Sequence, residues 1–248
     1  MDIYLIGAIA FNLAGFVKGV LGFGFPIIAL VVLTLSIGLF DALAILIVPT
    51  IATNFWQALA GPHLRAIMKR MGLYFAFAAV GVLCTSRYLT VVNVDLLIGL
   101  LGCVLFFFAL SRLFDLKITV PREKEPVLSV VLGLLNGALT GMTGSFMVPS
   151  VLYMQALGFP KDMLVQAMGA FFGISTLMMT ISLGRNGLID GDNFKLSMLA
   201  LGPAFIGILA GRWIRDQIDE KRFQHIFLFA VLFLGAYLVL RALKPLVL

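Results

Sequence analysis

Charged residues are scarce in this chain. They make up 12% of its 248 residues, about half the share found in ordinary soluble domains, whereas apolar residues make up 61%. Mean hydropathy is +1.09, and several apolar runs approach the ~20 residues that a helix needs to cross a bilayer. The alternation of apolar and polar residues that marks a membrane β-barrel is missing from runs such as 98–110. The composition therefore predicts an all-α polytopic membrane protein.

Cysteine and histidine are almost absent. The two cysteines, Cys84 and Cys103, both lie in apolar runs, and His63 and His225 are far apart in the sequence. Neither a disulfide framework nor a metal site is predicted from so few ligands, and no cofactor is expected. The first residues also lack the basic region of a signal peptide, so we expect the N-terminus to be the first membrane element.

Carboxylates are missing from the centres of the apolar runs. All 12 of them lie at predicted helix ends or in loops. This pattern argues against a proton relay or a cation site built on a buried carboxylate, and it favours an anionic substrate. No nucleophile and base pair lies within a predicted span, so an enzyme is not expected. Despite the net charge of +6, the basic residues are scattered among short loops, which argues against nucleic acid as a partner.

One glycine pattern is present twice. Gly-x3-Gly-x2-Gly occurs at 15–22 and again at 137–144, 122 residues later, and Pro26 and Pro149 follow the two copies. Glycine and proline break helices, and a broken helix in lipid must direct its free peptide groups toward protein or a watery cavity. The pattern indicates a binding site at two matching breaks; the alternative is that these glycines only allow close helix packing.

Ten helical elements can be bounded by glycine, proline and charge. They span 3–20, 24–39, 42–60, 72–90, 94–111, 128–143, 147–158, 163–184, 195–211 and 223–243. Five elements per half is an odd number, so the second half must enter the membrane from the opposite face. This predicts two inverted-topology repeats, 1–111 and 127–248, each opening with a broken or hairpin helix pair, joined by a cytoplasmic linker at 112–126.

Lysine and arginine predict the orientation in the membrane. Of the 18 basic residues, 12 fall on the side that carries the linker, 5 on the other side, and Lys18 lies apart within a span. Because cytoplasmic loops are enriched in these residues, we expect the linker inside and both termini outside the cytoplasm, in the inner (plasma) membrane.

The glycine breaks offer chemistry for an anion. Pro26 suits the first turn of a new helix, and the free N–H groups of that turn form a ready anion site. Two such helix starts meeting near the midplane are expected to form a small pocket rich in N–H donors. Lys18 lies inside the first motif, where a lysine costs ~2.5–3.5 kcal/mol at the bilayer centre unless it faces a cavity. The two interpretations are that Lys18 binds substrate, or that it reaches the membrane interface.

The third element of each half carries polar side chains. Thr50, Thr53, Asn54 and Gln57 fall on one stripe of a helix, and Ser175 and Thr176 occupy the corresponding element. Such a stripe either joins helices by hydrogen bonds or lines a pathway.

The segments GFVKGVLGFGFP, GALTGMTGSFMVP and PTIATNFWQA together resemble the sulfite exporter TauE/SafE family over nearly the whole chain. The resemblance implies a membrane transporter of a small sulfur-containing anion, such as sulfite, sulfoacetate or another organosulfonate, usually as an exporter. An anion channel or a facilitator for another small anion is the alternative. The expected partners are this anion and the lipid bilayer, with a homodimer as a further possibility. The candidate substrate-binding residues are Lys18, Gly22, Phe23, Gly24, Phe25, Asn54, Gln57, Thr143, Gly144, Ser145, Phe146, Ser175 and Thr176.

Overall fold

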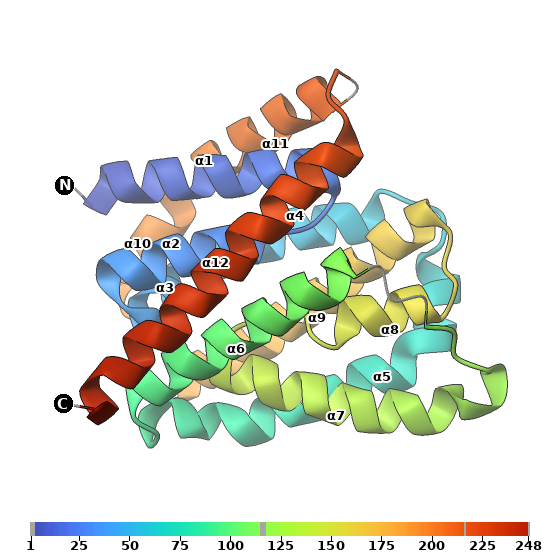
Figure 1. Ribbon diagram of the computed structural model, residues 1–248, viewed down its shortest axis with the longest axis horizontal. Coiled ribbons are helices and arrows are strands. Elements are labelled where there is room, and N and C mark those ends of the chain that lie inside the picture. Colours follow the sequence, from blue (N-terminus) through green and yellow to red (C-terminus); the bar gives the residue numbers. More distant parts are fainter. Residues whose placement is uncertain (1–2, 115–117, 216, 248) are drawn as a thin grey trace.

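The chain is a bundle of helices, most of which lie roughly along one common axis, in either direction (Figure 1). The computed structural model describes residues 3–114, 118–215 and 217–247, and over these residues it contains α-helices and two short 3-10 helices but no strand. The first half contains α1 (Ile3–Leu21), α2 (Phe25–Ile37), α3 (Leu39–Ile45), α4 (Ile47–Leu59), α5 (Leu64–Thr85), η1 (Ser86–Thr90) and α6 (Val94–Leu113). The second half contains η2 (Arg122–Lys124), α7 (Glu125–Thr143), α8 (Ser150–Ala156), α9 (Lys161–Arg185), α10 (Gly191–Leu199), α11 (Leu201–Arg215) and α12 (Glu220–Val247).

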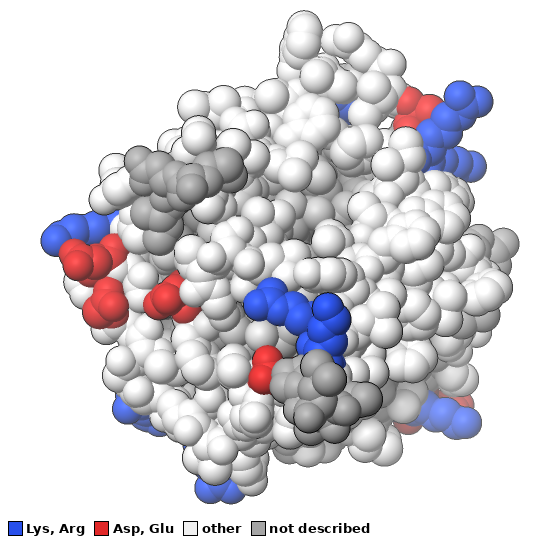
Figure 2. All heavy atoms as spheres, turned by 60° about the vertical axis from the view of Figure 1, so that its left-hand side comes forward, with Lys and Arg blue, Asp and Glu red and all other residues white. Residues whose placement is uncertain are grey.

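Seven stretches of the described chain are long and apolar enough to cross a membrane, and α3 with α4 forms an eighth that is bent by 46°. Figure 2 shows one face of the molecule, on which charged side chains gather in a few separate clusters and wide areas carry none. The prediction of an all-helical polytopic membrane protein is thus confirmed. The linker prediction falls partly on residues 115–117, and the predicted positions of the termini on residues 1–2 and 248, all of which lie outside the described residues.

Two predicted elements are each divided into two helices. The element expected at 42–60 is α3 followed by α4, and the one expected at 195–211 is α10 followed by α11. Proline explains both divisions because it has no N–H to donate four residues back. Pro49 leaves the carbonyl of Ile45 without its helical donor, and Pro203 does the same to Leu199. These carbonyls belong to the last residues of α3 and α10.

The element expected to begin at residue 72 begins earlier, at Leu64. The basic residues between 65 and 70 suggested a loop, which was wrong. Ile67 and Met71, four residues apart, are both fully buried. They give the first turns of α5 an apolar face that packs into the core, so the helix includes them.

Glycines join the long helices in pairs, and two of these pairs are parallel. In the pair α1 and α11, Gly15 lies against Ala204 and Gly19 lies against Ile208. In the pair α5 and α7, Gly133 lies against Tyr74 and Gly141 lies against Val82. In both pairs the residue numbers rise together, and backbones can approach this closely because glycine has no Cβ.

Two further pairs are antiparallel. In α6 and α12, Gly102 lies against Gly235 and Gly99 against Ala242. In α4 and α9, Gly169 lies against Ala58 and Gly173 against Phe55. In the predicted repeat, α1 corresponds to α7, α5 to α11, α4 to α9 and α6 to α12. Exchanging the halves would therefore exchange the two parallel pairs and leave each antiparallel pair in place. This agreement favours the inverted repeat, which stays a prediction.

The start of α1 and the end of α12 lie at the same end of the bundle (Figure 1). α5, α7, α9 and α12 all begin at the opposite end, which the basic-residue count assigns to the cytoplasm. We call this opposite end the linker end, because the connection between α6 and α7 lies there.

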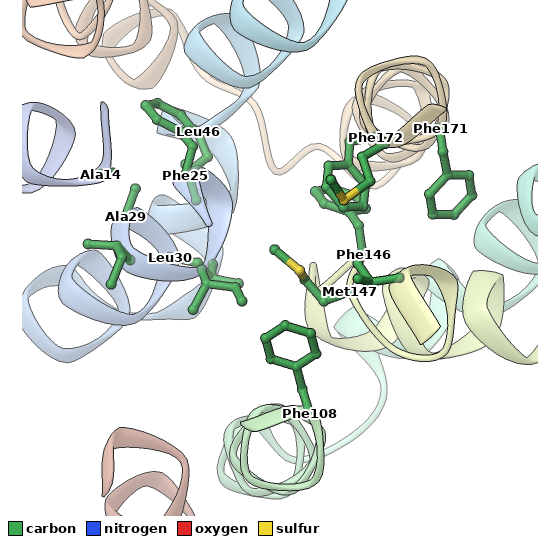
Figure 3. Close-up of a cluster of buried hydrophobic side chains, with 14 of the residues drawn as sticks. Ala14, Phe25, Ala29, Leu30, Leu46, Phe108, Phe146, Met147, Phe171 and Phe172 are labelled. Carbon is green, nitrogen blue, oxygen red and sulfur yellow. The ribbon is translucent and has the colours of Figure 1, made fainter. Parts of the chain in front are cut away.

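The centre of the bundle is packed with large apolar side chains (Figure 3). Phe25 and Leu30 approach it from α2, Phe146 and Met147 from the segment before α8, and Phe172 from α9. All of these side chains are buried. The core therefore lies at the level where the two glycine motifs interrupt their helices.

Candidate functional site

The first glycine motif does break its helix. α1 ends at Leu21 and α2 begins at Phe25. Gly22 and Gly24 between them have φ of 80° and 96°, a region that glycine enters at no steric cost. Pro26 lies in the first turn of α2, as predicted. The N-terminal peptide groups of α2 are therefore placed inside the bundle, near the break.

The second motif breaks its helix over a longer segment. α7 ends at Thr143, Gly144 has φ of 72°, and α8 begins only at Ser150. Side chains hold the intervening backbone: Thr140 Oγ1 donates to the carbonyl of Ser145 at 2.9 Å, and Asn136 Nδ2 donates to that of Phe146 at 3.3 Å. Pro149 precedes α8 instead of lying within its first turn. The two breaks are therefore alike in position and unlike in detail.

The breaks meet in the middle of the molecule. Two small cavities, of about 10 and 20 Å³, are each lined by Pro26 from the first break and by Gly144 and Phe146 from the second. Each holds at most about one water molecule. The expected pocket between two half-helix starts is thus closed in this conformation, because Phe146, Leu30 and Leu43 fill it.

Lys18 points inward from α1 toward α4. Its side chain is 6% exposed. Its Nζ donates to Thr53 Oγ1 at 3.2 Å and to Asn54 Oδ1, and it lies 5.9 Å from the centre of the Phe25 ring. All these partners are neutral, so the ammonium has no opposite charge among the contacts of the described residues. The sequence separation of 35 and 36 residues made this cluster invisible to any local pattern.

Lys18 lines a larger cavity near the linker end. Its volume is about 280 Å³. Three cations and no carboxylate are among the described residues that line it, and most of the remaining lining is apolar. The lining residues are Lys18, Gly19, Gly22, Thr53, Trp56, Gln57, Val165, Phe205, Ile208, Leu209, Arg212 and Arg215. We call this space the cationic cavity. Its size and charge suit a small anion with an apolar part.

Arg212 and Arg215 are functional candidates that the sequence analysis missed. They were counted only as basic residues at a loop, because they follow an apolar run. Their spacing of three residues places them on one face of a helix, and α11 extends through Arg215. Gly211 lies against Gly19 in α1, which brings the last turns of α11 beside Lys18. The missed signal was the glycine pattern at 207 and 211, which matches that of α1.

The polar stripe of α4 runs from the centre of the bundle to the cationic cavity near the linker end. Thr50 lines the larger of the two small central cavities, which we call the closed central cavity. One turn further on, Thr53 and Asn54 hold Lys18, and Gln57 lines the cationic cavity. The stripe thus extends from the closed centre to the cationic cavity. Gln57 also donates to the carbonyl of Val165 at 2.6 Å, so it joins α4 to α9 as well.

Three buried polar atoms near these cavities have no hydrogen-bond partner in the described part of the chain. They are Thr50 Oγ1, the Nδ2 of Asn54 and Ser145 Oγ. Most buried polar groups in native proteins are hydrogen-bonded, so each exception calls for an explanation. A polar ligand near these atoms is one such explanation.

The other predicted residues have varied surroundings. Phe23 packs edge-on against Phe227 of α12, with ring centres 6.0 Å apart, and does not line the cationic cavity. Gly24 lies between Phe227 and Val17. Thr143 accepts from the N–H of Ser145 at 3.2 Å, so its role there is to hold the break.

On α9, the two predicted residues differ. Thr176 lines the closed central cavity, and its hydroxyl donates to the carbonyl of Phe172 at 2.6 Å. Ser175 is buried but lines neither that cavity nor the cationic cavity. The structure therefore brings Thr176, Gly144 and Phe146 together at the centre. It brings Lys18, Gly22 and Gln57 together at the cationic cavity, with Asn54 bound to Lys18 behind them.

Within the described residues, no group of three or more histidine, cysteine or carboxylate side chains is arranged to hold a metal ion. The polar groups of the candidate site are cations, amides and hydroxyls, which recognise anions by charge and hydrogen bonding.

Apolar helices interrupted inside the bundle, around a cavity near the breaks, are the architecture of many polytopic membrane transporters. The chain belongs to the sulfite exporter TauE/SafE family, whose sequence model matches residues 7–238. Membership implies membrane transport of sulfite or a related anion, and it confirms the family resemblance carried by the glycine motifs. Searches of curated proteins and of solved structures found no match.

Proposed function

We propose that this protein exports a small sulfur-containing anion, such as sulfite, sulfoacetate or another organosulfonate, by alternating access, with Lys18 as the principal contact of the anion. One observation carries the proposal: Lys18 is buried beside a cavity that also contains Arg212 and Arg215 and no carboxylate among its described lining residues.

The energetic argument concerns the charge of Lys18. Burying an ammonium group is expensive unless an opposite charge compensates it. Thr53 and Asn54 supply hydrogen bonds but no charge. An anion in the cationic cavity would supply the missing charge, so the cost of burying Lys18 becomes affinity for the substrate.

The apolar part of the lining bears on which anion is bound. Trp56, Phe205 and Ile208 line the same cavity as the cations. A bare inorganic ion gains nothing from such surfaces, whereas the carbon part of an organosulfonate gains by leaving water. This favours an organosulfonate over sulfite.

The path through the molecule would follow the stripe of α4. An anion bound at Lys18 would next meet Thr50, Thr176 and the second break, where Ser145 Oγ lacks a partner. With its centre closed, the protein would be in a state in which the anion can occupy only the cationic cavity near the linker end. Movement of the two breaks relative to each other would open the other side, as in transporters built from inverted repeats.

The remaining predictions complete the proposal. Thr143, Gly144, Ser145, Phe146 and Thr176 would line the path beyond Lys18. Phe23, Gly24, Phe25 and Ser175 would shape the breaks around it. The protein would lie in the inner (plasma) membrane with both termini outside the cytoplasm, and a homodimer is compatible with this arrangement.

An anion channel is the second candidate, because it would use the same cavity without a conformational cycle. Counterflow in proteoliposomes distinguishes the two. A carrier takes up labelled sulfoacetate faster when the vesicles are preloaded with unlabelled sulfoacetate, whereas a channel shows no such stimulation.

The test of the site is Lys18→Met. Loss of a buried charged partner costs about 2–5 kcal/mol, which corresponds to a drop of about 30-fold or more in anion affinity. Methionine is also unbranched and apolar, so we expect the variant to fold. Lys195→Met is the matched control, because Lys195 is exposed on α10, outside the cationic cavity. Equal counterflow by both variants would remove Lys18 from the site.

A further inference from the structure

A second basic cavity lies at the linker end, between the first turns of α5 and α7. Its volume is about 560 Å³. Lys69 and Arg70 line it from α5, and Arg122 and Glu125 line it from the start of α7 and the residues before it. None of these residues lines the cationic cavity. The inference from this second cavity does not depend on the proposed function.

The acidic residue in this cavity is already neutralised. Glu125 accepts two hydrogen bonds from Arg70, at 3.0 Å from Nε and 2.7 Å from Nη2. The guanidinium also donates to the carbonyl of Leu157 at 3.0 Å. Arg70 and Glu125 therefore form the wall of the cavity and leave no negative charge free to repel an anion.

Lys69 and Arg122 are the two cations left over. Both are exposed, and neither side chain makes a hydrogen bond or close ion pair with another residue in the described part of the chain. They face the same space. Two adjacent cations beside an already neutralised carboxylate suit one phosphate group.

Apolar side chains continue from this cavity along the outside of the bundle. Leu73 lines the cavity and is 44% exposed, and Val80, two helical turns further along the same face of α5, is 48% exposed. α5 and α7 are both among the candidate membrane spans, so this face lies where acyl chains would be. A ligand that fits both parts has an anionic head and apolar tails.

We propose that this cavity binds an anionic glycerophospholipid, with its phosphate between Lys69 and Arg122 and its acyl chains along α5 and α7. Basic pockets between membrane helices bind the head groups of anionic lipids. The apolar face distinguishes a lipid from a free phosphate, which has no use for it.

The test is the binding of phosphatidylglycerol to the full chain in detergent, measured by native mass spectrometry. Each lysine or arginine near an anionic lipid surface contributes ~1 kcal/mol, or about fivefold in affinity. The double variant Lys69→Ala with Arg122→Ala is therefore expected to bind phosphatidylglycerol about 25-fold more weakly. Arg65→Ala with Lys124→Ala is the control, because it removes two nearby cations that do not line the cavity.

Three further arms complete the test. Phosphatidylcholine is expected to bind much more weakly, glycerol phosphate at the same concentration is expected not to bind, and Lys69→Arg with Arg122→Lys is expected to retain binding. Equal losses in the two double alanine variants, or equal binding of phosphatidylcholine, would overturn the proposal. Binding of glycerol phosphate as tight as that of the lipid would assign the cavity to a soluble anion, which also overturns it.

Discussion

Lys18 is the residue whose chemistry depends most on its neighbours. Asn54 presents Oδ1 to the ammonium group and leaves Nδ2 without a partner in the described chain. An amide at this position orients the lysine without cancelling its charge. In the proposed site, this neutral side chain would keep the cation available to an anion.

Replacing this amide by a carboxylate tests the idea with almost no change in shape. In Asn54→Asp, the new charge would pair with Lys18 directly, and the cavity would lose most of its attraction for anions. We expect transport to fall about as far as in Lys18→Met, by about 30-fold or more. The measurement is the initial rate of sulfoacetate counterflow in proteoliposomes.

Asn93→Asp is the control for this substitution. Asn93 is exposed and caps the start of α6 by accepting from the N–H of Asp95 at 2.8 Å, and aspartate caps helices equally well. Normal transport by Asn54→Asp would mean that the charge of Lys18 is not used for binding, and that its hydrogen bonds only join α1 to α4.

Among the elements, the glycine-paired helices form the closest contacts of the fold. A Cβ added to Gly15 would lie 2.2 Å from the carbonyl oxygen of Ala204, and one added to Gly19 would lie 2.4 Å from that of Ile208. These contacts are between backbones, so no side chain can turn away to make room. We expect α1 and α11 to move together during transport, as do α5 and α7.

Gly15→Ala is predicted to destabilise the protein. Forcing a methyl group into a packed interior costs about 1–3 kcal/mol, and here α1 and α11 must separate to admit it. Gly7→Ala is the matched control on the same helix, because nothing lies within 4 Å of its added Cβ. Thermal unfolding in detergent should give a clearly lower midpoint for Gly15→Ala and an unchanged or slightly higher one for Gly7→Ala. Equal midpoints would show that the pair is less tightly packed than the structure indicates.

At the scale of the whole molecule, the structure shows one conformation, which in the proposed transport cycle would alternate with a second one. The cationic cavity lies near the linker end, and the centre is closed by Phe146 and its neighbours. The start of α1 and the end of α12 lie at the other end. If the linker end faces the cytoplasm, as the basic residues predict, this conformation would be the one in which an exporter takes up its substrate. The orientation is therefore part of the functional hypothesis.

Cysteine labelling tests the orientation. Native Cys84 and Cys103 are first replaced by alanine, because Cys84 is exposed. Single cysteines are then placed at Arg65 and Arg87, which lie near opposite ends of α5. In intact spheroplasts, an impermeant maleimide should label Arg87→Cys at once and Arg65→Cys only after permeabilisation. The reverse pattern would invert the predicted topology, and labelling of both from outside would contradict a spanning α5.

Much of this architecture could be predicted from local sequence. The membrane class follows from the scarcity of charge, and the positions of the breaks follow from glycines and prolines at 15–26 and 137–149, because both act on the backbone within a few residues. Lys18 stood out for the same reason, as a lone charge within an apolar run. These are signals that one helix carries by itself.

Other features depended on contacts between distant segments. Tertiary packing placed Thr53 and Asn54 around Lys18, brought Arg212 into the same cavity and turned Phe23 toward Phe227. It also filled the centre that the sequence pattern predicted to be an open pocket. Hydropathy and periodicity indicate which residues avoid water, but they do not say which helix faces which, since that depends on the shapes of surfaces far apart in the chain.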